Sequence, residues 1–248
     1  MITSNINNGI KFWDKHEKTL ARASKEFGIP SEIMVAIIGV ETRYGSNRGS
    51  YRVIDALSTL AFDYPPRASF FRKELIEFLK LKEIAGIDTA TAKGSYAGAM
   101  GYPQFIPSSY HHYAVDYDKD SKTDLIENPV DAIGSVGNYF KVHGWQTGQP
   151  VTTRANLAAT SDLAEEFNRQ LKPKFNVGHF RSKGLIPVSK TEDKEPATAM
   201  KLEGKKGTEY WLGLTNFYVI TRYNHSKLYA MAVYQLSKEI KLAKKKAI

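Results

Sequence analysis

The pattern of apolar and polar residues predicts helices over roughly the first ninety residues of the chain. From Phe12 to Phe27 apolar side chains recur at helical spacing, and Gly28-Ile29-Pro30 then ends the helix. A nearly unbroken apolar run over 33–40 follows, opened by Pro30 with Ser31 as an N-cap and closed by Gly45. The same spacing predicts further helices over 54–61, 70–81, 129–142 and 228–242.

Two stretches break this helical pattern. Residues 94–107 combine glycines and prolines with large apolar side chains, which indicates a shaped loop where backbone can approach a ligand closely. Residues 149–212 are polar and lysine-rich, with short β-prone pieces at 150–153, 175–177 and 211–212. We therefore expect a predominantly α-helical α+β fold, made of a helical core over 1–148, a small mixed α/β insert over 149–212, and a C-terminal segment over 213–248 that returns to the core.

Glu41 is the only carboxylate between Ile33 and Gly45, and it falls in the last turn of the expected helix. The negative end of the helix dipole and the apolar neighbours both disfavour a charged carboxylate there, so the pKa of Glu41 should rise. A general acid that works near neutral pH needs such a pKa. The alternative is a structural ion pair with Arg43 or Arg48.

The composition is that of an ordinary globular protein. Hydrophobic residues make up 42% of the 248 residues, and no run approaches the roughly 20 apolar residues of a membrane span. The N-terminus lacks the basic and apolar regions of a secretory signal, so we expect export to depend on a removed segment or to be absent. The absence of cysteine excludes disulfides, thiol catalysis and cysteine-ligated zinc.

The formal net charge of +9 indicates an anionic partner, either nucleic acid or an anionic cell envelope. The chain has no zinc-finger spacing, no aromatic RNA-binding strand and no phosphate-binding glycine loop, which leaves nucleic acid as the weaker option. His111, His112 and His143 show no consistent metal-ligand spacing, and a nucleophilic Gly-x-Ser-x-Gly motif is missing.

An acidic loop over 116–127 carries carboxylates at its positions 1, 3, 5, 9 and 12, the spacing with which an EF-hand loop surrounds Ca²⁺. Position 7 would ligate through the carbonyl of Lys122, and Asp131 could add or replace the final ligand. Ser121 departs from the pattern, since glycine normally permits the sharp turn at position 6. The pattern predicts a cation site, and the alternative is an exposed charged turn. The five carboxylates of the pattern are Asp116, Asp118, Asp120, Asp124 and Glu127.

Tyrosines and amides form a second set of candidates. Aromatic faces hold the apolar C–H faces of sugar rings, and amides and hydroxyls bond their edges. Each tyrosine alone is more often a core residue, so the sugar-site hypothesis depends on these residues converging on Glu41. They are Tyr96, Tyr102, Gln104, Phe105, Tyr139 and the segment 223–229.

Three blocks in the same order resemble the membrane-bound lytic transglycosylase B family. They are VAIIGVETRYG around Glu41, GSYAGAMGYPQFIPSSY over 94–110, and NPVDAIGSVGNYF over 128–140. Arg222-Tyr223-Asn224 and Tyr229 support the match. The resemblance implies a lysozyme-like fold, an EF-hand-type calcium loop, and cleavage of the β-1,4 bond between N-acetylmuramic acid and N-acetylglucosamine in peptidoglycan with release of 1,6-anhydromuramic acid.

The resemblance also implies roles for individual residues. Glu41 matches the catalytic acid and base. Glycan-site positions of the family fall on Ser95, Gln104, Phe105, Tyr139, Tyr223, Asn224 and Tyr229, and metal positions on Asp116, Asp118, Asp120, Lys122 through its carbonyl, and Asp131. It implies a structural Ca²⁺, no cofactor for catalysis, peptidoglycan strands as substrate with cell-wall synthesis or division proteins as further partners, no nucleic acid, and a periplasmic or outer-membrane setting. The oligomeric state stays open, with a monomer favoured.

A usual glycosidase needs two carboxylates at the scissile bond, whereas the site motifs here offer only Glu41. In a lytic transglycosylase this one residue would first protonate the glycosidic oxygen and then deprotonate the sugar's 6-hydroxyl. The alternatives are a lysozyme-type hydrolase of the same bond and a non-catalytic peptidoglycan-binding protein. Two features depart from the family: Pro103 stands where its loop usually has glycine, and the match begins almost at the first residue, whereas family members begin with an export or lipid-attachment segment. This start leaves two alternatives, a truncated chain and a trimmed gene product.

Overall fold

The computed structural model describes residues 2–246, and the chain divides into two compact units. Unit 1 comprises Met1–Lys141 and Gln235–Ile248, and unit 2 comprises Val142–Tyr234. The helix α10 (Lys227–Lys246) contributes its first residues to unit 2 and the rest to unit 1. No helix within 2–246 is long and apolar enough to cross a membrane.

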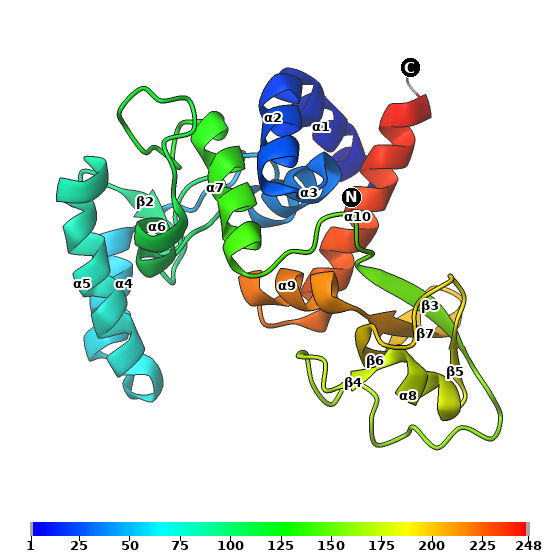
Figure 1. Ribbon diagram of the computed structural model, residues 1–248. Coiled ribbons are helices and arrows are strands. Elements are labelled where there is room, and N and C mark those ends of the chain that lie inside the picture. Colours follow the sequence, from blue (N-terminus) through cyan, green and yellow to red (C-terminus); the bar gives the residue numbers. More distant parts are fainter. Residues whose placement is uncertain (1, 247–248) are drawn as a thin grey trace. The chain divides into compact units, whose positions relative to one another are not determined.

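Unit 1 is built around α3 (Ser31–Thr42), against which α1 (Ile2–Lys15) and α2 (Glu17–Phe27) pack (Figure 1). Helix α3 is apolar on all sides, so it is buried along nearly its whole length. The interruption between α1 and α2 at His16 was not predicted. Ser31 was predicted as the N-cap, and this is wrong: Pro30 occupies that position, while the Ser31 hydroxyl donates to Leu20 O at 3.3 Å.

The rest of unit 1 is a second helical group joined by loops. Helices α4 (Val53–Phe62) and α5 (Ala68–Ala85) form an antiparallel pair connected by a 3₁₀ turn, η1 (Pro65–Arg67), and α6 (Pro107–Tyr113) packs on α5. Strands β1 (Tyr51–Arg52) and β2 (Lys93–Gly94) pair antiparallel, and β1 contacts α4. Helix α7 has the predicted bounds, Pro129–Val142.

Glycines in α7 let large side chains lie directly on its backbone. A Cβ at Gly134 would lie 2.3 Å from the Tyr117 ring, and one at Gly137 would lie 2.4 Å from the ring of Phe27. Such separations are impossible for real atoms, so only glycine allows this packing. Helix α7 therefore holds both the end of α2 and the start of the acidic loop.

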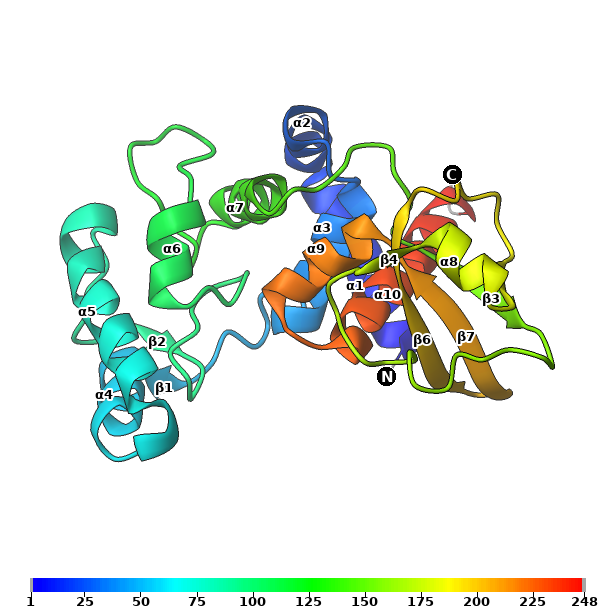
Figure 2. The same ribbon diagram turned by 60° about the horizontal axis from the view of Figure 1, so that its bottom comes forward.

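Unit 2 contains a five-stranded antiparallel sheet in the order β4-β6-β7-β3-β5. Strands β6 and β7 lie side by side in Figure 2. Its apolar core lies between the sheet and α8, around Phe180, Leu163 and Leu212. The predicted β-prone pieces fall in three of these strands, whereas β5, β6 and the helices α8 and α9 were not predicted. The elements are β3 (Thr152–Leu157), β4 (Phe175–Asn176), α8 (Val177–Ser182), β5 (Leu185–Pro187), β6 (Pro196–Gly204), β7 (Gly207–Gly213) and α9 (Thr215–Tyr223).

Candidate functional site

Glu41 is the penultimate residue of α3 and is half-buried, as expected for a residue in the last helical turn. The helix ends at Thr42, three residues before the predicted stop at Gly45. Arg43 and Tyr44 both adopt left-handed backbone, with φ of 50° and 61°. Their N–H groups donate to Gly39 O and Ile38 O at 3.0 and 3.3 Å, which closes the helix one residue after Glu41.

The side chain of Tyr44 stabilises this abrupt helix end. Its ring lies on Gly39, where a Cβ would come within 2.5 Å, and its hydroxyl donates to Asn5 O at 2.9 Å. The ring of Phe12 packs beside it at 5.7 Å between centroids. Burial raises the pKa of the Tyr44 phenol, so it stays a neutral donor. Tyr44 thus joins α1 to the end of the Glu41 helix.

Thr42 joins the same helix end to the 94–105 loop. Its hydroxyl oxygen lies 3.1 Å from Ile38 O and 3.1 Å from Tyr102 O, and it accepts the N–H of Gly45 at 3.0 Å. Two further contacts hold the loop here. The Gln104 amide donates to Arg48 O at 3.2 Å, and Gly49 approaches Gly94 so closely that a Cβ would lie 2.1 Å from its backbone. The loop predicted from glycine and proline content therefore lies against the segment that follows Glu41.

Within the loop, short-range hydrogen bonds fix the candidate residues. Ser95 Oγ accepts the N–H groups of Ala97 and Ala99 at 3.2 and 3.0 Å. Met100 and Phe105 exchange backbone hydrogen bonds at 2.9 and 3.1 Å. Between them the Gln104 N–H donates to Gly101 O at 3.3 Å, so the turn does not need an N–H at Pro103. The departure at Pro103 is thus compatible with a closed turn.

Phe105 and Tyr139 belong to a buried aromatic cluster. Their ring centroids are 5.7 Å apart, and Tyr113 lies 4.9 Å from Tyr139 and 6.5 Å from Phe105. Phe105 is 2% exposed and Tyr139 7% exposed. These two predicted site residues therefore lie close together, with little of either side chain accessible to solvent.

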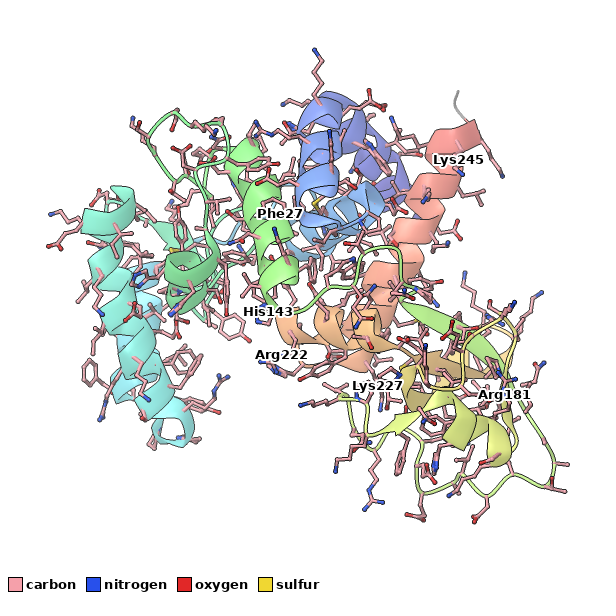
Figure 3. The ribbon with its side chains drawn as sticks, in the orientation of Figure 1. Phe27, His143, Arg181, Arg222, Lys227 and Lys245 are labelled. Carbon is pink, nitrogen blue, oxygen red and sulfur yellow. The ribbon has the colours of Figure 1, made fainter. Side chains whose placement is uncertain are left out.

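The other three predicted glycan-site residues belong to unit 2. Tyr223 ends α9, Asn224 follows it in extended backbone, and Tyr229 lies in the first turn of α10. Ser226 organises the turn, because its N–H donates to Asn224 O and its hydroxyl accepts the N–H of Tyr229 at 3.3 Å. Figure 3 labels Arg222, in the last turn of α9, and Lys227, the first residue of α10.

The acidic loop brings its first three carboxylates together, as its spacing predicts. Oxygens of Asp116, Asp118 and Asp120 lie within 4.8 Å of one another. Asp116 accepts the N–H groups of Lys119, Asp120 and Ser121, at 2.7, 3.2 and 2.9 Å, so the backbone wraps around this side chain. This oxygen-rich donor set fits a hard cation such as Ca²⁺.

The backbone conformation of Ser121 explains why glycine is usual at this position of an EF-hand loop. Its φ is 71°, in the left-handed region that favours glycine. The loop therefore adopts the sharp turn despite the serine side chain. The next residue, Lys122, is exposed, and its N–H donates to the Asp120 carboxylate at 2.8 Å.

Asp131 lies beneath the loop, fully buried on α7. Its two carboxylate oxygens accept the N–H groups of Tyr117 at 2.7 Å and Asp124 at 2.8 Å, one from each arm of the loop. Burial raises its pKa, and these hydrogen bonds oppose that rise. Asp131 therefore fixes the width of the loop, whatever share it takes in holding a cation.

Arg48 connects the acidic loop to the site loop. Its guanidinium donates to Ile126 O and to the Glu127 carboxylate, the latter at 2.9 Å, and lies 5.2 Å from the centre of the Tyr102 ring. Glu127, position 12 of the EF-hand spacing, is thus paired with an arginine. Sequence reasoning proposed Arg48 as a partner of Glu41 and missed this role.

The sequence of residues 1–238 matches the family model described as the transglycosylase SLT domain. Over 240 residues the chain is 48% identical to the membrane-bound lytic murein transglycosylase B of Escherichia coli strain K12, covering 97% of this chain but 65% of that protein.

Two solved structures are also similar. The catenated lytic transglycosylase SltB1 from Pseudomonas aeruginosa has a TM-score of 0.94 and 54% identity, over 97% of this chain and 79% of that one. The Escherichia coli lytic transglycosylase Slt35 in complex with calcium has a TM-score of 0.89 and 47% identity, over 97% of this chain and 75% of that one. Both similarities extend over unit 1 and unit 2.

Proposed function

The chain belongs to the family of the transglycosylase SLT domain, with its lysozyme-like fold, and on that basis we propose that it is a peptidoglycan lytic transglycosylase. It cleaves the β-1,4 bond between N-acetylmuramic acid and N-acetylglucosamine and leaves a 1,6-anhydromuramic acid end. The curated relative that it matches is a murein transglycosylase, of which this chain spans 65%.

The observation that carries the proposal is the placement of Glu41. It is a half-buried carboxylate directly before Thr42, whose hydroxyl ties the helix end to the loop that bears Ser95, Gln104 and Phe105. A fixed acid beside groups suited to sugar recognition is the arrangement that glycoside cleavage requires.

Glu41 acts twice in the reaction. It first gives its proton to the glycosidic oxygen, so that the bond to the anomeric carbon breaks and the alcohol leaves. The substrate's own N-acetyl group stabilises the cationic centre. The 6-hydroxyl of the same sugar then attacks the anomeric carbon, and the Glu41 carboxylate takes the hydroxyl proton. The starting protonation state is restored and no water is consumed, which explains how one carboxylate suffices.

Glycan recognition falls to the remaining predicted residues. The amide of Gln104 and the hydroxyl of Ser95 hydrogen-bond the sugar substituents, and Phe105 and Tyr139 form the apolar wall behind them. Tyr223, Asn224 and Tyr229 of unit 2 carry the same aromatic and amide groups, and we infer from the family resemblance that they also contact glycan. The net charge of +9 suits an anionic cell-wall substrate and a periplasmic or outer-membrane setting.

The acidic loop holds a structural Ca²⁺. The clustered oxygens of Asp116, Asp118 and Asp120, with the carbonyl of Lys122, supply its ligands, and Asp131 contributes directly or through the backbone that it fixes. The related Slt35 was solved in complex with calcium. The ion neutralises carboxylates that would otherwise repel one another, and catalysis itself uses no cofactor.

The test is mass spectrometry of muropeptides released from purified peptidoglycan by the wild type, Glu41→Gln and Glu32→Gln. Glu32 is the matched control, because it lies at the other end of α3 and pairs with Lys241 at 2.6 Å. We expect products one water lighter than reducing muropeptides from the wild type and the control, and none from Glu41→Gln.

Two other outcomes would replace the proposal. Reducing-end products would make the protein a lysozyme-type hydrolase. Binding of peptidoglycan without any release by the wild type would make it a non-catalytic binding protein.

A further inference from the structure

Glu74 is a second acid on an apolar helix face. It lies on α5, on the same side as Phe71 and Phe78, and is 4% exposed. Burying a carboxylate costs free energy unless hydrogen bonds replace the lost water. The partners of this side chain therefore indicate why it is there.

Both carboxylate oxygens of Glu74 accept hydrogen bonds from Ser108. The N–H of Ser108 donates to Oε2 at 3.0 Å, and the Ser108 hydroxyl donates to Oε1 at 2.7 Å. Ser108 lies in the first turn of α6, where backbone N–H groups have no partner within the helix. The residue in the N-cap position is Ile106, which cannot supply a side-chain acceptor. Glu74 thus caps α6 from another helix.

Helix α6 lies between the two loops of the candidate site. The 94–105 loop runs directly into its start. Further along, the hydroxyl of Tyr110 donates to Thr123 O at 2.8 Å and accepts the N–H of Leu125 at 3.1 Å. Leu125 O in turn accepts the N–H of Tyr102 at 2.9 Å. The start of α6 therefore anchors the site loop, and its other contacts anchor the acidic loop.

We propose that Glu74 is a positioning residue for substrate binding, which fixes the 94–105 loop by capping α6 through Ser108. This inference rests on the proposed glycan-binding role of that loop. Glu74 does not touch substrate. Without it, the Ser108 N–H loses its acceptor, the start of α6 loosens, and Gln104 and Phe105 no longer hold one geometry.

Two substitutions separate geometry from charge. Glu74→Leu removes both acceptors. Glu74→Gln removes the charge and can keep both hydrogen bonds, the second with its direction reversed, since its carbonyl can accept the Ser108 N–H while its NH₂ donates to the hydroxyl oxygen. The control is Glu32→Leu, which removes a glutamate of unit 1 that is 9% exposed, lies at the start of α3 and pairs with Lys241 at 2.6 Å. Ser108→Ala, which deletes one of the two hydrogen bonds, is a milder variant should Glu74→Leu fail to fold.

The first readout is the rate of muropeptide release against peptidoglycan concentration. For Glu74→Leu we expect the half-saturating concentration to rise at least about fivefold, with a smaller change in maximal rate. Ser108→Ala should also raise the half-saturating concentration, and Glu74→Gln should keep it close to the wild-type value. Equal effects of Glu74→Leu and Glu32→Leu at equal loss of thermal stability would overturn the proposal.

The second readout, hydrogen exchange, needs no activity. Amides in 94–113 should exchange faster in Glu74→Leu than in the wild type or in Glu32→Leu, and unchanged exchange there would overturn the proposal. Faster exchange together with an inactive wild type would locate the failure in the proposed function, since the effect of Glu74 on the loop would stand.

Discussion

The hydroxyl of Thr42 lies 3.1 Å from the carbonyl oxygen of Tyr102, which joins the end of the Glu41 helix to a loop sixty residues further along the chain. Thr42 is fully buried, so this polar contact forms without competing water. Its single hydroxyl hydrogen is shared with Ile38 O, and its oxygen accepts the Gly45 N–H. One side chain therefore hydrogen-bonds the helix, the segment that follows it and the loop.

Thr42→Val keeps the shape of this side chain and removes its hydroxyl. We expect a loss of about 1–3 kcal/mol in the free energy of unfolding, because buried groups lose their partners. Loss of alignment between Glu41 and the loop should lower kcat/KM by about tenfold or more. Urea unfolding and muropeptide release measure the two effects.

Thr198→Val in unit 2 is the control, since Thr198 is 3% exposed and donates to Gln170 O at 2.8 Å. It should lower stability without this loss of activity. Full activity in Thr42→Val would show that the contact stabilises the fold and does not align the site.

Gly101 is required by close packing as well as by its backbone conformation. Its φ is 70°, and a Cβ would lie 2.1 Å from Leu125 O of the acidic loop. Gly86, at φ 65°, has nothing within 4 Å. Gly86→Ala should therefore cost about 1 kcal/mol from backbone strain alone.

Gly101→Ala should cost about 1–3 kcal/mol more, because the two loops must separate. Thermal unfolding of both variants measures the difference. Equal destabilisation would mean that the loops can move apart freely.

Ser121→Gly should tighten Ca²⁺ binding. Serine at φ 71° carries left-handed strain that glycine avoids, although glycine adds freedom to the unbound loop. The net gain is about 0.5–1 kcal/mol in binding free energy, a few-fold in Kd. Titration calorimetry with CaCl₂ measures it. Ser121→Ala keeps the Cβ and should bind like the wild type, so equal affinities of the glycine and alanine variants would contradict the strain argument.

Glu166 makes unit 2 sensitive to acid. Burial raises the pKa of Glu166, but hydrogen bonds from Lys183 and His179 outweigh this and hold the pKa below its ordinary value of 4.5. A depressed folded-state pKa contributes stability above the unfolded value, and this stability is lost as the pH falls through the folded value. Glu166→Gln should therefore lower the stability of unit 2 by about 1 kcal/mol near neutral pH and progressively less below pH 4.5.

Tryptophan fluorescence during urea unfolding reports on this unit if Trp13 is replaced by Phe, because Trp145 and Trp211 are both in unit 2. Glu165→Gln, at the exposed neighbouring position, is the control and should change little. If Glu166→Gln were destabilised as much below pH 4.5 as near neutral pH, the stability of unit 2 would not depend on the ionisation of Glu166.

The elements predicted from the sequence are those with strong local signals. Helix α7 was predicted residue for residue, because Pro129 opens it and Gly144 follows its end. The apolar run of α3 located Glu41 correctly in the last helical turn. The acidic spacing predicted that Asp116, Asp118 and Asp120 would gather, and their oxygens do. The glycan and metal roles of individual residues stay predictions.

What the sequence could not predict depends on contacts between distant segments. The Ser31 cap was wrong because its hydroxyl bonds α2 instead of its own helix. The early end of α3 depends on Tyr44, whose hydroxyl and ring contact Asn5 and Phe12 of the distant helix α1. Glu74 was detectable in principle, since an acid on the face of Phe71 and Phe78 is the same signal that marked Glu41. Its partner Ser108 lies in α6, a helix that was not predicted.

Arg43 and Tyr44, which both have left-handed backbone conformations, should respond differently to selection for thermostability. Arg43 is exposed, and glycine there would relieve strain without removing a buried contact. Tyr44 has the same strain, but its ring and hydroxyl hold α1 against α3. A population evolved for thermostability alone should therefore accept glycine at position 43 and retain tyrosine at position 44. At position 43 backbone strain alone decides the preferred residue, whereas at position 44 the contacts of the tyrosine side chain outweigh the same strain.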